Sequence, residues 1–428
     1  MQGPWSYDVP EGWRVRPLWS EFRRVKTLGD GSEELLSVYR DYGVIRKSSR
    51  EDNFNKPSED LSKYQRVSVG DLVVNKMKAW QGSLGVSIHE GIVSPAYFVF
   101  KATGNFDGRF AHYLLRSKDY VDHMGAISSG IRPNQWDLDP AQFAVTPLLA
   151  PPPAEQRAIV DYLDRETAQI DAFIAKNEKV MSLLTERRAA VIAGAVKRGL
   201  DAAVRLRSSG VEWLGHVPIH WPVQRLASTV LRTRSGVWGA DPQGDENDLR
   251  CVRVADFDRS SQRVHDSAYT IRNVTASERA GRVLKKGDLL LEKSGGGEKS
   301  PVGFVVLYDR DEPAVCSNFV ARVQLQDNMD SAFWTYVHGV MYRSRLTERS
   351  TKQSTGIQNL DQNAYFNEYV PVPPYREQQA IAKYLKIRLA EFDDTIKTAR
   401  RGVDLARERR KALIAAAVTG KIDLGIVT

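Results

Sequence analysis

The sequence has no run of about 18 apolar residues, only two cysteines and no basic-then-apolar leader at its N-terminus. The first absence argues against a membrane span, and the last argues against a secretory signal. Cys251 and Cys316 both lie in the second half of the chain and are too few for a disulfide framework. We therefore expect both cysteines to be buried and reduced, and the protein to be cytoplasmic.

Signatures of catalysis are also lacking. Residues 373–375, Pro-Pro-Tyr, resemble part of an amino-methyltransferase motif, but Val372 stands where an amide or carboxylate is needed. Residues 295–300 resemble a phosphate-binding loop, but Glu298 replaces the glycine before the lysine. There is no Cys-x-x-Cys pair, which argues against a zinc site. We expect this chain to hold no catalytic residue, no metal and no cofactor.

What the sequence does have is length and a basic surplus. Its 428 residues are enough for two to four folding units. Lysine and arginine exceed aspartate and glutamate by a formal charge of +8. Such a surplus favours a polyanionic partner, because neutralising phosphates releases their counterions.

The strongest feature is an internal duplication. The segment PPPAEQRAIVDYL, which begins at Pro151, matches PPYREQQAIAKYL, which begins at Pro373. The offset of 222 residues then holds without a gap as far as Asp201 and Asp423. Upstream similarity is patchy and its offset varies. Its patches pair Val9-Pro10 and Trp13 with Val217-Pro218 and Trp221, Gly70-Asp71-Leu72 with Gly287-Asp288-Leu289, and Gly130-Ile131 with Gly356-Ile357. This pattern indicates a shared scaffold that carries two diverged surfaces.

Both conserved segments read as long helices. Apolar residues recur at steps of three and four over 154–196 and over 375–419, and prolines precede each start. Because one amphipathic helix of this length cannot bury its own stripe, we expect the twins to pair as an antiparallel, intramolecular coiled coil. Gly402 is a position where the second helix could bend. The alternative is two unrelated surface helices on separate domains.

The remaining sequence predicts two mixed α/β domains, so the fold class is α+β with pseudo-twofold repetition. β-branched and aromatic runs bounded by glycine predict strands at 67–76, 91–100, 283–293, 301–308 and 317–325. Helices are expected near 107–121 and 330–346. The predicted division is a first recognition domain at 1–150, a helical spacer at 151–203, a second recognition domain at 204–370 and a second spacer at 371–428.

These features together resemble the specificity subunit of type I restriction–modification systems. The resemblance rests on the two Pro-Pro-x-x-Glu-Gln helix starts, the Glu-Arg-Arg triplets at 186–188 and 408–410, and the paired Val-Pro-x-x-Trp entries. It implies a non-catalytic subunit whose two target recognition domains each read one half of a split site in double-stranded DNA. It also implies two methyltransferase subunits and two restriction subunits as partners, which would use S-adenosylmethionine, ATP and Mg. No membrane partner is expected.

Base reading requires amide and basic side chains on protruding loops. In each half such residues follow the Gly-Asp-Leu turn and the Gly-Ile turn. The expected DNA-contacting residues are Lys76, Lys78, Trp80, Arg132, Asn134 and Gln135 in the first half, and Lys293, Lys299, Lys352, Gln353, Gln358 and Asn359 in the second. Arg46, Lys47, Arg50, Arg232 and Arg234 could contact phosphates. The alternative is that all of these are ordinary solvated loop residues.

Two other functions are compatible with the sequence. One is a coiled-coil adaptor whose α/β domains bind protein, and salt-sensitive binding to a specific duplex would distinguish a DNA reader from it. The other is a complete enzyme, which methylation by the purified chain alone would reveal.

Overall fold

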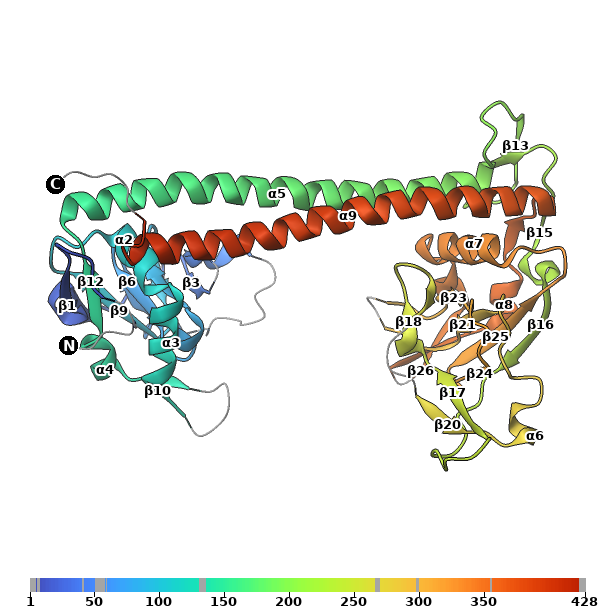
Figure 1. Cartoon of the computed structure of the whole chain (residues 1–428), viewed down its shortest axis with the longest axis horizontal. Coiled ribbons are helices and arrows are strands. Elements are labelled where there is room, and N and C mark those ends of the chain that lie inside the picture. The colour runs from blue at the N-terminus through green and yellow to red at the C-terminus, as the bar shows by residue number, and fades with distance from the viewer. Residues whose placement is uncertain are drawn as a thin grey trace. The chain divides into compact units, whose positions relative to one another are not determined.

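A computed structural model describes residues 5, 8–40, 42–50, 58, 60–130, 136–265, 270–297, 300–354 and 356–422. The chain forms two compact units: residues 1–179 with 399–428, and residues 180–398 (Figure 1). The boundaries between them fall inside two long helices, so each unit contains a piece of both. The two units are therefore described in turn.

The long helices are α5 (Pro153–Arg198) and α9 (Tyr375–Val418), of 46 and 44 residues. Both are continuous, so Gly402 does not break α9 as its composition allowed. A β-carbon at Gly402 would lie 3.6 Å from the ring of Phe173 in α5. A side-chain β-carbon would therefore fit here in ordinary van der Waals contact, and Gly402 neither bends α9 nor is required for the two helices to approach.

Within each unit the two helices pack antiparallel, as the sequence predicted. In the first unit the early part of α5 meets the late part of α9, where Arg410 Nε lies 2.9 Å from Asp171 Oδ1. In the second unit the late part of α5 meets the early part of α9, where Arg188 Nε lies 3.3 Å from Asp393 Oδ1. Apolar residues of both helices join one buried cluster in each unit. The duplicated stripe is thus buried against its twin.

The first unit contains an antiparallel four-stranded sheet. In order across the sheet, its strands are β2 (Phe22–Val25), β9 (Tyr97–Ala102), β6 (Leu72–Asn75) and β7 (Leu84–Val86). Two helices, α2 (Gly108–Leu115) and α3 (Lys118–Ala126), follow the sheet in the chain. A short antiparallel pair, β1 (Arg14–Pro17) and β12 (Pro147–Ala150), brings the start of this domain to the start of α5.

The second unit repeats this topology. Its strands run in the same order, β16 (Val230–Ser235), β25 (Val320–Leu325), β21 (Leu289–Glu292) and β23 (Val305–Leu307), before two short additional strands. The helix α7 (Ser331–Arg343) follows, and β15 (Val223–Arg225) pairs with β28 (Tyr369–Pro371). We call the part of each unit outside α5 and α9 its head. The common strand order confirms that the duplication includes both heads. The heads differ outside this sheet, where the second has a three-stranded sheet of β17 (Asp248–Val252), β20 (Ile271–Asn273) and β24 (Ala314–Cys316).

The repeated Gly-Asp-Leu triplets form the same turn in both heads. Gly70 and Gly287 have φ values of +91° and +96°, a region that side chains rarely adopt. The Asp71 carboxylate accepts a hydrogen bond from the Ser68 amide, and the Asp288 carboxylate accepts one from the Lys285 amide. Each turn leads directly into the central strand that precedes the candidate DNA loop.

The repeated Glu-Gln pair in the first turn of α5 and of α9 forms hydrogen bonds that connect each long helix to its head. Trp13 Nε1 donates to Glu155 at 2.9 Å, and Trp221 Nε1 donates to Glu377 at 2.9 Å. The tryptophans of the paired entries therefore bind the glutamates at the helix starts. This contact explains why two motifs far apart in sequence are duplicated together.

The glutamines next to these glutamates are buried and make a second set of matching contacts. Gln156 accepts from the Asp107 amide at 2.7 Å and donates to the Pro151 carbonyl at 2.8 Å. Gln378 accepts from the Asp330 amide at 2.9 Å and donates to the Pro373 carbonyl at 2.9 Å. Asp107 and Asp330 are the N-caps of α2 and α7, so each glutamine ties a head helix to a long helix.

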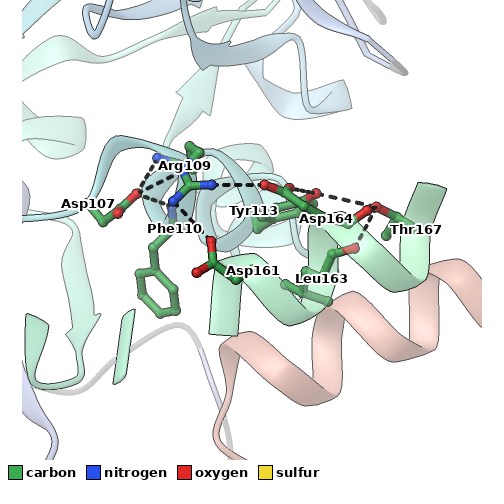
Figure 2. Close-up of polar contacts among 8 residues, drawn as sticks. All are labelled: Asp107, Arg109, Phe110, Tyr113, Asp161, Leu163, Asp164 and Thr167. Carbon is green, nitrogen blue, oxygen red and sulfur yellow. Dashed lines mark hydrogen bonds and ion pairs between the residues drawn. The ribbon is translucent and has the colours of Figure 1, made fainter. Parts of the chain in front are cut away.

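The first head has an additional ionic connection. Figure 2 shows Arg109 of α2 facing Asp161 and Asp164 of α5, at 3.3 and 3.1 Å. Tyr113 also donates to Asp164 at 2.7 Å, and burial raises the pKa of its hydroxyl to about 12, so the donor stays protonated. At the 222-residue offset the two aspartates are replaced by Lys383 and Lys386, both exposed. The scaffold is thus shared, but this connection is not.

Several predicted element bounds were wrong. The predicted strand at 67–76 contains the end of β5 (Gln65–Val67), the Gly-Asp turn and β6, because the turn reverses the chain. The predicted strand at 91–100 is β8 (Gly91–Val93) followed by β9. The predicted helix near 107–121 is two helices, because Arg116 adopts a non-helical conformation and Ser117 is the extended N-cap of α3.

In the second head the predictions were right in type but too long. The strand expected at 283–293 begins only at Leu289, since the Gly287 turn occupies its first half. The strands expected at 301–308 and 317–325 are β23 and β25, and the helix near 330–346 is α7. Cys251 and Cys316 are buried free thiols, as expected.

Candidate nucleic-acid interface

In the first head two candidate segments meet. Lys76, just after β6, lies 2.9 Å from Asp137, at the start of β11 (Asp137–Leu138). The rings of Trp80 and Trp136 lie 5.1 Å apart between centroids. The residues after the Gly-Asp-Leu strand are therefore adjacent to the end of the segment that follows the Gly-Ile turn. Lys78 is exposed. Arg132, Asn134 and Gln135 lie outside the described residues.

In the second head the corresponding segments form one small sheet. Its strand order is β22 (Ser294–Gly295), β27 (Ile357–Leu360) and β26 (Thr351–Ser354). Asn359 is paired with Ser294 on one side and with Lys352 on the other. Gln358 has the same position between Gly295 and Gln353. Lys299 lies outside the described residues, and only the backbone of Gln353 is described.

The two heads place these segments in the same way. The Leu138 amide donates to the Lys76 carbonyl at 2.8 Å, and the Leu360 amide donates to the Lys293 carbonyl at 2.9 Å. The hairpins that precede the long helices are the antiparallel pairs of β10 (Ser128–Ser129) with β11 in the first head and of β26 with β27 in the second. Each is thereby hydrogen-bonded to the residue that follows the central strand. The sequence had nominated these segments separately, and tertiary contacts join them.

Side-chain contacts rank the second-head candidates. Gln358 Oε1 accepts a hydrogen bond from the Val302 amide at 3.1 Å, so this half-buried amide supports the hairpin. Asn359 is exposed, and its Oδ1 accepts from Ser294 Oγ at 2.6 Å. Lys293 is half-buried, and its Nζ donates to Ser235 Oγ at 3.0 Å. Asn359 and Lys293 are therefore better placed for DNA contact than Gln358.

Lys352 is paired with an acidic neighbour. Its Nζ lies 2.7 Å from Asp361 Oδ2. The hydrogen bond from Lys352 holds the pKa of the Asp361 carboxyl below its ordinary value, so the pair stays ionised. A phosphate that binds Lys352 must compete with this carboxylate.

A polar cavity of about 530 Å³ adjoins the second-head hairpin. Lys352 and Asn359, two of the residues predicted to contact DNA, line this cavity. The sequence did not point to five other polar lining residues: Thr233, Ser235, Asp361, Gln362 and Asn363. For Thr233 and Ser235 the signal was the exposed, hydroxyl-bearing and basic pattern of β16, where Arg232 and Arg234 are also exposed. Arg234 Nη1 donates to the Ala280 carbonyl at 2.8 Å.

Over the described ranges, no helix is long and apolar enough to cross a membrane. Nor do three or more histidine, cysteine, aspartate or glutamate side chains gather at a potential metal site in the part of the chain that the structure describes.

Comparisons with known proteins agree with the duplicated architecture. The family model for the type I restriction modification DNA specificity domain matches residues 270–401. The StySPI specificity subunit of Salmonella potsdam is 24% identical over 436 residues, covering 97% of this chain and 90% of that protein. The EcoKI specificity subunit of Escherichia coli K12 is 21% identical with the same coverage.

Solved structures show the same fold. A chain from a study of complex assembly and conformational transition of the type I R-M system aligns with a TM-score of 0.71 at 14% identity, covering 97% of this chain and 100% of that one. The HsdS subunit from Thermoanaerobacter tengcongensis aligns with a TM-score of 0.52 at 17% identity, covering 97% and 99%. With its twin heads and paired helices, this chain is similar to type I restriction–modification specificity subunits over nearly its whole length.

Proposed function

We propose that the chain is the sequence-specific DNA-binding subunit of a type I restriction–modification complex. Each head reads one half of a bipartite target in double-stranded DNA. The chain itself is non-catalytic: it directs methyltransferase and restriction subunits that supply the chemistry. Two copies of each partner are expected, and those partners carry S-adenosylmethionine, ATP and Mg.

One observation carries this proposal. Both heads have the same sheet order and present a hairpin fixed to the end of the central strand, yet the side chains beside the two hairpins differ. The first hairpin is associated with Lys76, Trp80 and Trp136, whereas the second is associated with Asn359 and Lys293. Reading two unlike half-sites requires a common backbone framework that presents different polar and aromatic side chains.

Electrostatics supports DNA rather than a protein ligand for these surfaces. The formal charge of the chain is +8, and cations lie near the second hairpin: Arg232 and Lys352 are exposed, and Lys293 is half-buried. Phosphate contacts position a reader on the duplex, and amides such as Asn359 discriminate bases. Arg132, Asn134 and Gln135, which lie outside the described residues, remain predicted contacts.

The test begins with adenine methylation mapped across DNA from cells with and without this protein. We expect a bipartite motif that is modified only when the chain and its methyltransferase partner are both present. Binding of the complex to that duplex should weaken steeply with salt. Methylation without sequence preference, or no duplex binding, would refute the proposal, and salt-insensitive binding to a protein alone would favour an adaptor role.

Substitutions then assign the reading surface. Asn359→Ala should relax discrimination within one half-site by roughly 1–3 kcal/mol and leave the other half-site unchanged. Lys293→Ala should weaken binding to all sequences and reduce its salt dependence. Lys397→Ala is the matched control, because Lys397 is an exposed lysine on α9 outside the hairpin. If Lys293→Ala and Lys397→Ala changed DNA affinity equally, the hairpin would not be part of the DNA interface.

A further inference from the structure

A second cavity adjoins the hairpin of the second head. It has a volume of about 510 Å³ and a mostly apolar lining that includes Trp238, Phe319, Val254 and Gly295. Gly295 belongs to β22, so this cavity borders the same hairpin as the polar cavity. The rings of Trp238 and Phe319 are nevertheless 40% and 47% exposed. Two large apolar side chains thus remain open to solvent beside a surface proposed to read DNA.

The Trp238 side chain is held in place rather than loosely exposed. The Arg272 guanidinium lies over its ring, 4.7 Å from the centroid. The same arginine donates to the Trp238 and Gly239 carbonyls, each at 3.1 Å, and pairs with Asp241. One group therefore covers part of the indole and fixes the backbone that carries it.

The loop that carries Trp238 is also packed too tightly to tolerate side chains at two glycines. A β-carbon at Gly236 would lie 2.0 Å from the Cys316 carbonyl oxygen. Gly239 has a φ of +69°, and its β-carbon would lie 2.3 Å from the Asn273 carbonyl oxygen. Because the loop is pressed against two strands, presenting the indole to a ligand costs little ordering entropy.

Phe319 lines the same cavity and is connected to the hairpin. Its carbonyl accepts hydrogen bonds from the Lys293 amide at 2.9 Å and the Ser294 amide at 3.3 Å. The aromatic cavity and the polar tips of the hairpin are therefore parts of one backbone arrangement. Glu292, which also lines the cavity, is neutralised by Arg259 at 3.0 Å, and Arg253 adds a half-exposed cation.

The chemistry of base edges selects the occupant. Among the four bases, only thymine presents an apolar group, its 5-methyl, in the major groove. We propose that the cavity between Trp238 and Phe319 receives a thymine 5-methyl group and thereby determines one position of the DNA target. This inference rests on the proposed function, since it requires the second head to read DNA.

The test uses the complex of this chain with its methyltransferase partner and the duplex identified by methylation mapping. Each thymine is replaced in turn by deoxyuridine, which lacks only the methyl group. Wild-type protein should lose affinity roughly fourfold at one thymine, the effect expected for one buried methyl. Trp238→Ala and Phe319→Ala should weaken binding of the natural duplex roughly tenfold and abolish discrimination at that same thymine.

Matched controls separate the possible failures. Tyr369→Ala removes another exposed aromatic from the second unit, on β28, and should leave thymine discrimination intact. Thermal unfolding of each variant identifies loss of fold, and Phe319→Ala provides a second test if Trp238→Ala is unstable. Two results would overturn the inference: unchanged thymine discrimination in a folded cavity variant, or a target whose binding is insensitive to every deoxyuridine substitution. If sequence-specific binding persists in these cases, the proposed function still stands. Absence of specific binding would overturn both.

Discussion

Substitution of Gln378 by alanine should destabilise the second unit selectively. Gln378 is 1% exposed. Its side chain accepts from the Asp330 amide and from Trp334 Nε1 at 2.9 and 3.0 Å, and donates to the Pro373 carbonyl at 2.9 Å. Alanine would leave these three groups without their partner. At about 1 kcal/mol or more for each orphaned group, the cost is about 3 kcal/mol.

The corresponding glutamine of the first unit provides an internal comparison. Gln156 has two such partners, the Asp107 amide and the Pro151 carbonyl. Gln156→Ala should therefore cost about 2 kcal/mol, and should affect the first unit instead. For units of this size, about 3 kcal/mol corresponds to a fall in Tm of about 6–12 °C, and about 2 kcal/mol to about 4–8 °C.

The assay must resolve the two units, because a chain with two compact units need not unfold in one step. Hydrogen exchange followed by mass spectrometry during a thermal ramp would report α2 and α7 separately. Gln379→Ala is the control, because Gln379 is the exposed neighbour on the same helix. A Gln378→Ala shift below about 3 °C, or equal loss of protection in both units, would refute the reasoning.

Three further predictions concern single contacts. Trp221→Phe keeps a buried ring but removes the donor to Glu377, and should lower the unfolding free energy of the second unit by about 1–2 kcal/mol in urea denaturation. Arg410→Ala breaks a partly exposed ion pair with Asp171 and should lower the unfolding free energy by less than about 1 kcal/mol in the same assay, because solvent screens the pair. A larger loss would contradict this reasoning. Burial lowers the pKa of His338 to about 4, from an ordinary value of 6.5. The unfolded chain therefore binds the proton first, and stability should fall by about 3 kcal/mol as the pH drops from about 6.5 to 4. His338→Gln should flatten that part of the stability profile, and an unchanged slope would assign it to other groups.

The predictions that succeeded rest on patterns written along the chain. The two long helices were placed within about two residues at either end, because an apolar stripe at helical spacing persists for more than 40 residues. The errors occurred where a turn interrupts a hydrophobic run. Gly70 and Gly287 each reverse the chain inside a segment that reads as one strand. A local hydrophobic pattern does not distinguish a turn that is followed by a buried strand from the continuation of one strand.

The candidate interface was predicted only as separate segments. The sequence nominated the residues near 76–80 and near 132–136 independently, and it is the Lys76–Asp137 and Trp80–Trp136 contacts that bring their ends together. It also ranked Gln358 with Asn359, although Gln358 supports the backbone at Val302. Which amide remains available for DNA contact depends on neighbours more than 50 residues away in the chain. Local composition does not identify those neighbours.

The sequence by itself determined the twofold repetition, the two helices and the absence of a disulfide framework, since each follows from spacing, periodicity or residue counts. Tertiary structure alone decided what the repeated residues do: Glu155 and Glu377 bind tryptophans, and Gln156 and Gln378 hold the head helices. It also decided where Trp238 stands, on a loop fixed by Arg272. The reason is geometric, because hydrogen bonds and ring contacts between distant segments depend on how strands pair, and that pairing exists only in the folded chain.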